Sequence, residues 1–115
     1  LTQSPNLMGF STSGVKFNVR TIPESWIMLK DVPTVEFGSQ YDRTRQLAEM
    51  FAGNPCVLLA NDSVVVTGDA LLQTFDRLEV AEFTARSLLM ASSLGKMYPI
   101  SDSEVEELRE AFHVE

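Results

Sequence analysis

The chain has 115 residues, of which 44% are hydrophobic, and carries a formal net charge of −7. That length suits one globular domain that builds a core without disulfides or metals. The acidic excess lies in residues 61–115 and no cluster of lysine and arginine occurs, which argues against nucleic acid or an anionic membrane as a partner. No run approaches the roughly 18 apolar residues of a membrane span, and no leader pattern precedes the first elements. We therefore expect a cytoplasmic protein.

The sequence pattern of the first half of the chain predicts short strands and helices in alternation. Residues 15–19 and 32–38 alternate with period two, as half-buried strands do, and Pro23 suits the start of a helix. We expect, in order, a turn at 11–14, a strand at 15–19, a helix at 22–29, a strand at 32–38 and a helix at 42–52. The Ser/Thr/Gly turn at 11–14 is either an ordinary turn or a nest of backbone N–H groups that binds an anion.

Cys56 is the only cysteine of the chain. A disulfide within the chain and a CxxC metal or redox site are therefore both excluded. Because Cys56 lies inside an apolar run, we expect a buried structural thiol, which fits a reducing compartment.

Residues 55–94 organise the rest of the chain. Two runs rich in valine and leucine flank the turn-forming residues 61–63, which predicts a β-hairpin over 57–66. A long helix follows from residue 70 to residue 94, a stretch without proline or glycine. Asp69 is the expected N-cap of this helix, and Gly95 is placed to end it in a left-handed conformation.

The long helix predicts one core face and one solvated face. The expected core positions recur near the 3.6-residue period: Leu71, Phe75, Leu78, Ala81, Ala85, Leu88, Leu89 and Met90. We expect the first three of these to pack on the hairpin. On the opposite face, Glu82 and Arg86 are spaced as an exposed i,i+4 pair. Glu79 and Glu82 are interpreted as a helix face or a subunit contact, with an acid–base pair as the alternative.

The tail of the chain contains a helix start. Ser101 and Glu104 form a capping box, and Ile100 with Val105 forms a hydrophobic staple. A short helix through Phe112 is expected.

The residues from 57 to 82 resemble the signature of the class II aldolase/adducin family. The hairpin reads VLLANDSVVVTG, similar to the family pattern VLLxNHGvvvxG. The helix that follows matches the pattern LxeAFxrxExxE at Leu71, Phe75, Arg77, Leu78, Glu79 and Glu82. Upstream, Ile22-Pro23-Glu24 and Val32-Pro33-Thr34-Val35 resemble a segment, PE…VPxVpY, of branches that act on sugar phosphates. The resemblance covers residues 20–112.

The resemblance implies a three-layer α/β/α domain, with helices on both faces of a largely antiparallel sheet. It implies that residues 1–115 are one class II aldolase/adducin-like domain, the C-terminal half of the full one. Family members assemble as homotetramers, so we expect a homo-oligomer or pairing with a missing N-terminal half. They bind a divalent metal, commonly zinc, through a His-x-His pair and a third histidine in the NHG turn. The metal acts as a Lewis acid in cleaving a ketose phosphate.

The chain departs from the family at the metal positions. Asp62 stands where the third histidine is expected, and Ser63 replaces the glycine after it. When the start of the chain is laid on the family's HxHPP segment, Leu1 and Gln3 occupy the other two positions, and neither suits zinc. His113 is the only histidine and is expected in a solvated tail. An alternative alignment places residues 12–14 on a phosphate-binding PSG turn, and it too leaves the three-histidine site absent.

Two functions remain open at this stage. The first is a lyase-type domain of carbohydrate metabolism that acts on sugar phosphates with a degenerate or displaced metal site. Asp62 would be its remaining metal ligand and Glu24 its proton-transfer carboxylate, and any divalent metal would need ligands from elsewhere. The second is a non-catalytic, adducin-like domain for assembly. An Asn-Asp-Ser turn also favours aspartate on conformational grounds alone, so an ordinary turn role for Asp62 stays open.

Overall fold

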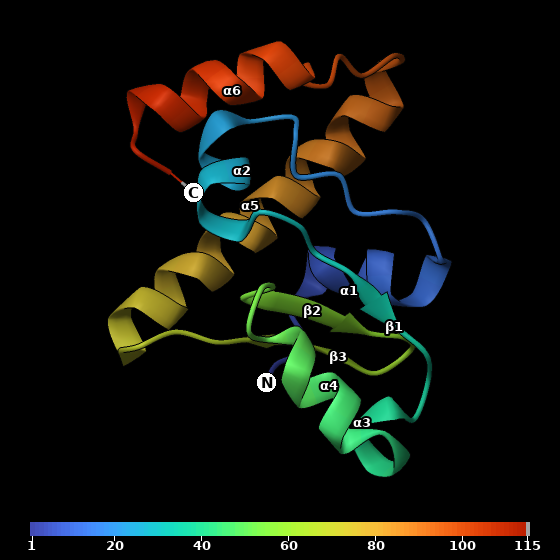
Figure 1. Ribbon diagram of the computed structural model, residues 1–115. Helices are drawn as coiled ribbons and strands as arrows, with labels where there is room; N and C mark the ends of the chain where they lie inside the picture. Colours follow the sequence, from blue (N-terminus) through green and yellow to red (C-terminus); the bar gives the residue numbers. More distant parts are fainter. Residues whose placement is uncertain (115) are drawn as a thin grey trace.

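A small sheet of three strands, in the order β1-β2-β3, lies at the centre of the computed structural model, which describes residues 1–114 (Figure 1). The strands are β1 (Thr34–Val35), β2 (Cys56–Leu59) and β3 (Ser63–Val66). β2 and β3 are antiparallel, with Cys56 opposite Val66 and Leu59 opposite Ser63. β1 runs parallel to β2. An isolated antiparallel bridge joins Thr2 to Val64 on the outer side of β3.

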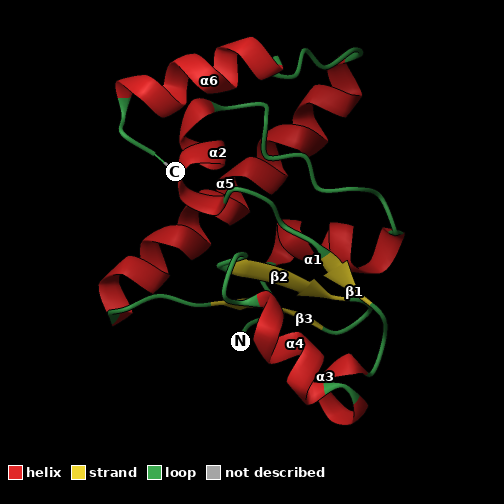
Figure 2. Ribbon diagram, viewed as in Figure 1, coloured by secondary structure: helices red, strands yellow, loops and turns green. Residues whose placement is uncertain are grey.

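Helices lie on both sides of this sheet (Figure 2). They are α1 (Pro5–Ser13), α2 (Pro23–Leu29), α3 (Ser39–Asp42), α4 (Thr44–Met50), α5 (Leu71–Leu94) and α6 (Asp102–Ala111). α1 packs against α5, and both contact β2 and β3. Figure 1 shows α3 and α4 below the sheet, away from α1 and α5. This mixed α/β arrangement with a largely antiparallel sheet confirms the expected fold class.

The main core lies between the sheet, α1 and α5. Leu58 and Val64 are fully buried in it, and the Phe10 and Phe17 rings meet edge to face with centroids 5.1 Å apart. Because side chains alternate along a strand, Val57 and Leu59 point to the other face of the sheet, and they are buried as well. Cys56 lies in the main core, and desolvation raises the pKa of its thiol to about 12. The prediction of a buried thiol is confirmed.

The hairpin is confirmed, with its turn one residue earlier than expected. The turn covers residues 60–62, and Ser63 is already the first residue of β3. Asn61 has a φ of 59°, in the left-handed region that asparagine tolerates better than most residues.

The predicted turn at 11–14 and strand at 15–19 are both wrong. α1 continues through Ser13, and Gly14 ends it with a φ of 73°. Both hydroxyls in this stretch have acceptors: Ser11 Oγ donates to the Leu59 carbonyl on β2 at 2.8 Å, and Thr12 Oγ1 donates to the Met8 carbonyl within α1 at 2.8 Å. Hydroxyl side chains with such partners are compatible with a helix. Residues 15–19 form a loop, although Phe17 and Val19 are buried.

The middle of the chain follows the prediction with shorter elements. The helix expected from residue 22 to residue 29 is present as α2. The expected strand at 32–38 is reduced to the two residues of β1. The helix expected at 42–52 spans only Thr44–Met50, because Asp42 belongs to the separate short helix α3.

The long helix is confirmed as α5, but its start and its core face differ from the expectation. Its N-cap is Ala70, and the backbone N–H of Asp69 donates to Gln73 Oε1 at 2.7 Å, so Asp69 is not the cap. Leu71 and Phe75 are 88% and 52% exposed. The side chains that α5 buries come from its middle: Ala81, Thr84, Ala85 and Leu88. Three of the four are small, which suits a stretch of α5 against which both α1 and α2 pack.

The C-terminal helix α6 is confirmed with its capping box. The Ser101 hydroxyl accepts from the backbone N–H of Glu104, and the Glu104 carboxylate accepts from the backbone N–H of Ser101. Val105 is buried, and the Arg109 guanidinium lies over the Trp26 ring, 5.3 Å from its centroid. No helix within residues 1–114 combines the length and apolar character needed to cross a bilayer.

Candidate functional site

The start of the chain lies against the tip of the hairpin. The side-chain amide of Gln3 donates from Nε2 to the backbone carbonyl of Asp62 at 3.0 Å. The neighbouring Thr2 exchanges two backbone hydrogen bonds with Val64, at 3.0 and 2.9 Å. Two of the positions singled out in the sequence, residues 3 and 62, are therefore neighbours in space although 59 residues separate them.

Asp62 has a structural role in the turn. Its backbone N–H donates to the Leu59 carbonyl at 3.0 Å, and its carboxylate Oδ2 accepts from Ser63 Oγ at 2.7 Å. These contacts hold the hairpin tip and occupy one carboxylate oxygen. The other oxygen, Oδ1, is the atom left for a ligand.

The remaining positions do not complete a metal site around Asp62. The side chain of Leu1 has no donor atom, and the residue is 81% exposed. His113 follows α6 at a φ of 53°, in the C-terminal tail where it was expected. Within residues 1–114, no group of three or more histidine, cysteine, aspartate or glutamate side chains is arranged to hold a metal ion.

Glu24 lies in the first turn of α2 and is exposed. Figure 1 places α2 beside the middle of α5, well away from the tip of the hairpin. The structure therefore does not bring Glu24 and Asp62 together. A proton-transfer role for Glu24 stays a prediction.

Glu82 on α5 joins the start of α1 through several hydrogen bonds. Its carboxylate accepts from the backbone N–H of Asn6 at 3.1 and 3.0 Å, from Asn6 Nδ2 at 2.8 Å and from the backbone N–H of Leu7 at 3.0 Å. These backbone groups belong to the first turn of α1, where helical N–H donors have no partner within the helix. A carboxylate there also suits the helix dipole.

These hydrogen-bond donors stabilise the charged form of Glu82. Partial burial raises its pKa, but hydrogen bonds from Ser4, Asn6 and Leu7 outweigh that effect, so the pKa lies below its ordinary value. The expected exposed pair of Glu82 with Arg86 is therefore wrong, because Glu82 points to α1. Neighbouring Glu79 is exposed, as a helix-face residue would be.

No sequence signal marked Glu82 as the anchor of α1. Ser4 occupies the N-cap position without capping the helix through its side chain. The Glu82 carboxylate caps the helix instead, although Glu82 lies 76 positions after Asn6 in the sequence. Together, Glu82 and Asp62 fix the segment around Gln3 at two points, one on α5 and one on the hairpin.

Comparison with solved structures identifies the architecture. The chain is 30% identical to YgbL from Klebsiella pneumoniae, described as a candidate aldolase/epimerase/decarboxylase, with a TM-score of 0.75. YgbL from Escherichia coli, described in the same words, is 25% identical with a TM-score of 0.80. An L-fuculose 1-phosphate aldolase is 22% identical with a TM-score of 0.79. The fold is class II aldolase-like.

The match extends over most of this chain but only part of each neighbour. It covers 91%, 93% and 96% of this chain, in the same order. It covers 53%, 54% and 53% of those proteins, so this class II aldolase-like chain spans about half of their length. No protein-family model matches the sequence, and the curated proteins contain no match.

Proposed function

We propose that this chain is a class II aldolase-like domain of carbohydrate metabolism, related to lyases that cleave ketose 1-phosphates, with a degenerate metal site. The hydrogen bond from Gln3 Nε2 to the Asp62 carbonyl supports this proposal most directly. It joins two positions at which the family resemblance expects histidine ligands, and neither carries one.

The side chains at these positions do not fit zinc. Zinc sites in enzymes use three ligands, mainly imidazole, thiolate or carboxylate, and keep one position open. Here the side chain of Leu1 has no donor atom, Gln3 offers only a neutral amide, and Asp62 is a single carboxylate, whose Oδ2 accepts from Ser63. A weakly held, hydrated Mg²⁺ or Mn²⁺ on Asp62 is the only metal chemistry that the turn suits. A sugar phosphate is the proposed small-molecule partner.

Metal content and turnover test this proposal together. The protein is purified without chelator, its zinc is measured, and aldol cleavage of ketose 1-phosphates is assayed with added divalent ions. We expect no stoichiometric zinc and no chelator-sensitive turnover. Stoichiometric zinc with turnover that a chelator abolishes would contradict the degenerate site and return the chain to the metal-dependent aldolases.

A role in assembly is the second candidate, favoured by the apolar surface of α5. Leu71, Leu72, Phe83 and Leu94 are 88%, 72%, 63% and 88% exposed. Large exposed apolar surface is typical of an interface. The partner would be a further copy of this chain or the complementary half of the domain, as in a non-catalytic, adducin-like assembly.

Sedimentation tests the assembly role. We expect the chain to self-associate at micromolar concentration, and we expect Phe83→Ser to weaken this association. Glu79→Ser is the matched control, since it changes another exposed residue of the same helix without removing apolar surface. A stable monomer across the concentration range would count against this role.

A further inference from the structure

An apolar hollow lies between α1 and the C-terminal part of α5. It has a volume of about 310 Å³, and the loop after α1 and Met97, which follows α5, complete its wall. Two of its lining residues, Phe10 and Leu88, are almost fully buried. A cavity of about 150 Å³ holds a benzene ring, so this hollow has room for an apolar group about twice that size.

Gly9 leaves one side of the hollow open. It lies in the middle of α1, where glycine favours the helix less than alanine or leucine does. Its backbone does not require glycine, because its φ is not positive. The packing does not require glycine either, since a Cβ atom at position 9 would have no heavy atom within 4 Å. The missing side chain therefore adds space to the hollow at a cost to the helix.

A cation and a hydroxyl group border this apolar space. Of the described residues that line the hollow, Lys16 alone is charged, and no carboxylate within residues 1–114 forms a salt bridge with its ammonium. Ser13 also lines the hollow; its Oγ accepts from the backbone N–H of Val15 at 3.3 Å, which leaves its O–H able to donate. An ammonium and a hydroxyl donor suit a singly charged carboxylate. A phosphate monoester carries about two charges, more than one lysine balances.

We infer that this hollow binds a small carboxylic acid with an apolar body of about two fused rings. The body lies against Phe10, Leu88 and Met97, and the carboxylate pairs with Lys16. The net charge of the chain is −7, so the attraction for an anion comes from Lys16 and not from the protein as a whole. The site is separate from the hairpin tip, because none of the lining residues belongs to β2, β3 or the turn between them. It goes beyond the proposed function, since it involves neither the metal positions nor a sugar phosphate.

Titration of the chain with naphthoate tests the inference. The methyl signals of Leu88 and Met97 are followed by NMR. We expect saturable shifts of both signals with a dissociation constant of about 0.1 mM, which is reasonable for a ligand of this size. Naphthalenemethanol, the uncharged analogue, should bind about two- to fivefold more weakly, the contribution of an exposed ion pair. The absence of saturable shifts with naphthoate would overturn the inference.

A substitution at Gly9 shows whether the hollow itself is the site. Gly9→Leu should weaken naphthoate binding about tenfold or more, because the leucine side chain occupies the space of the ligand. The variant should be no less stable than the wild type in urea, since leucine favours a helix more than glycine does. Equal naphthoate affinity of Gly9→Leu and the wild type would contradict binding in the hollow.

A substitution at Lys16 tests the charge pairing. We expect Lys16→Met to weaken naphthoate about two- to fivefold and to leave the affinity for naphthalenemethanol unchanged. Arg45→Met is the matched control: it removes one positive charge from α4, on the other side of the sheet, and should change neither affinity. Equal weakening of the acid and the alcohol by Lys16→Met would show that Lys16 does not pair with the carboxylate and would overturn the inference.

Discussion

The carboxylate of Glu82 on α5 and the amide groups of Asn6 on α1 hold two helices together. Asn6 donates from its backbone N–H at 3.1 and 3.0 Å and from its side chain at 2.8 Å. Hydrogen bonds to a charged group contribute about 1.5–3 kcal/mol, so we expect Glu82→Ala to lower the free energy of unfolding by about that amount. Urea unfolding at neutral pH measures the loss. The control Glu79→Ala changes an exposed neighbour, and its effect should stay within about 0.5 kcal/mol.

The Glu82 contact should weaken in acid. Its ordinary pKa is 4.5 and its pKa in the folded protein is lower, so folding favours the charged form. The stability that it supplies is complete above pH 4.5 and is lost as the pH falls through the lower folded value. We expect the difference in unfolding free energy between the wild type and Glu82→Gln to shrink over this acid range. A difference that stays constant with pH would mean that Glu82 contributes through shape alone.

Two substitutions on α5 distinguish its observed core face from the face that periodicity predicts. Phe75 is 52% exposed, whereas Leu88 is 5% exposed. We expect Phe75→Ala to reduce the free energy of unfolding by about 1 kcal/mol, since only part of the ring leaves water on folding. Leu88→Ala should cost about 2–5 kcal/mol, as buried leucines do. The reverse order in thermal or urea unfolding would restore the periodicity-based face.

Local signals predicted the elements well, and distant contacts explain the failures. The hairpin, α5 and the capping box of α6 follow from turn residues, a run without breakers and a four-residue motif. α1 was missed because Ser11 finds its acceptor, the Leu59 carbonyl, on a strand far along the chain. The role of Glu82 was missed for the same reason. The resemblance located Gln3 and Asp62, but only the three-dimensional contact shows that they are neighbours.

A histidine at one of the three positions where the family has metal ligands should not by itself create a metal site. Asp62→His places a single imidazole beside Gln3, and one imidazole is not a three-ligand site. We therefore expect this variant to retain no stoichiometric zinc after dialysis. Metal analysis by mass spectrometry measures the content, with the wild type treated in parallel. Tight zinc binding by the single variant would show that other ligands lie within reach of the hairpin tip.

Cys56 should be inert while the protein is folded. Its side chain is fully buried, and desolvation raises the pKa of the thiol to about 12. The thiolate is the reactive form, so a thiol reagent at pH 8 should modify Cys56 only in molecules that have opened. We expect the rate of modification to rise with urea in step with unfolding. Fast modification in the absence of urea would show that β2 is accessible in the native state.

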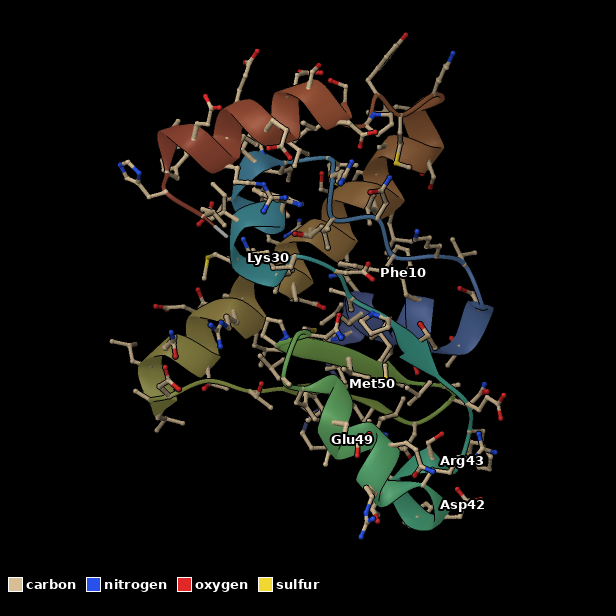
Figure 3. All side chains as sticks on the ribbon, in the orientation of Figure 1. Phe10, Lys30, Asp42, Arg43, Glu49 and Met50 are labelled. Carbon is tan, nitrogen blue, oxygen red and sulfur yellow. The ribbon has the colours of Figure 1, made fainter. Side chains whose placement is uncertain are left out.

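The turn after α2 determines which residues the chain tolerates at position 30. Lys30 has φ 64° and ψ −67°, and the backbone N–H of Asp31 donates across it to the Leu29 carbonyl at 2.7 Å, which makes a γ-turn of the strained, left-handed type. Figure 3 shows Lys30 at the end of α2. Its ammonium lies over the Trp26 ring, 4.5 Å from the centroid. Branched side chains such as valine and isoleucine are strongly disfavoured at such a φ. The positive φ therefore decides which residues position 30 accepts: glycine is accepted there, and a branched aliphatic residue would disturb the path from α2 into β1.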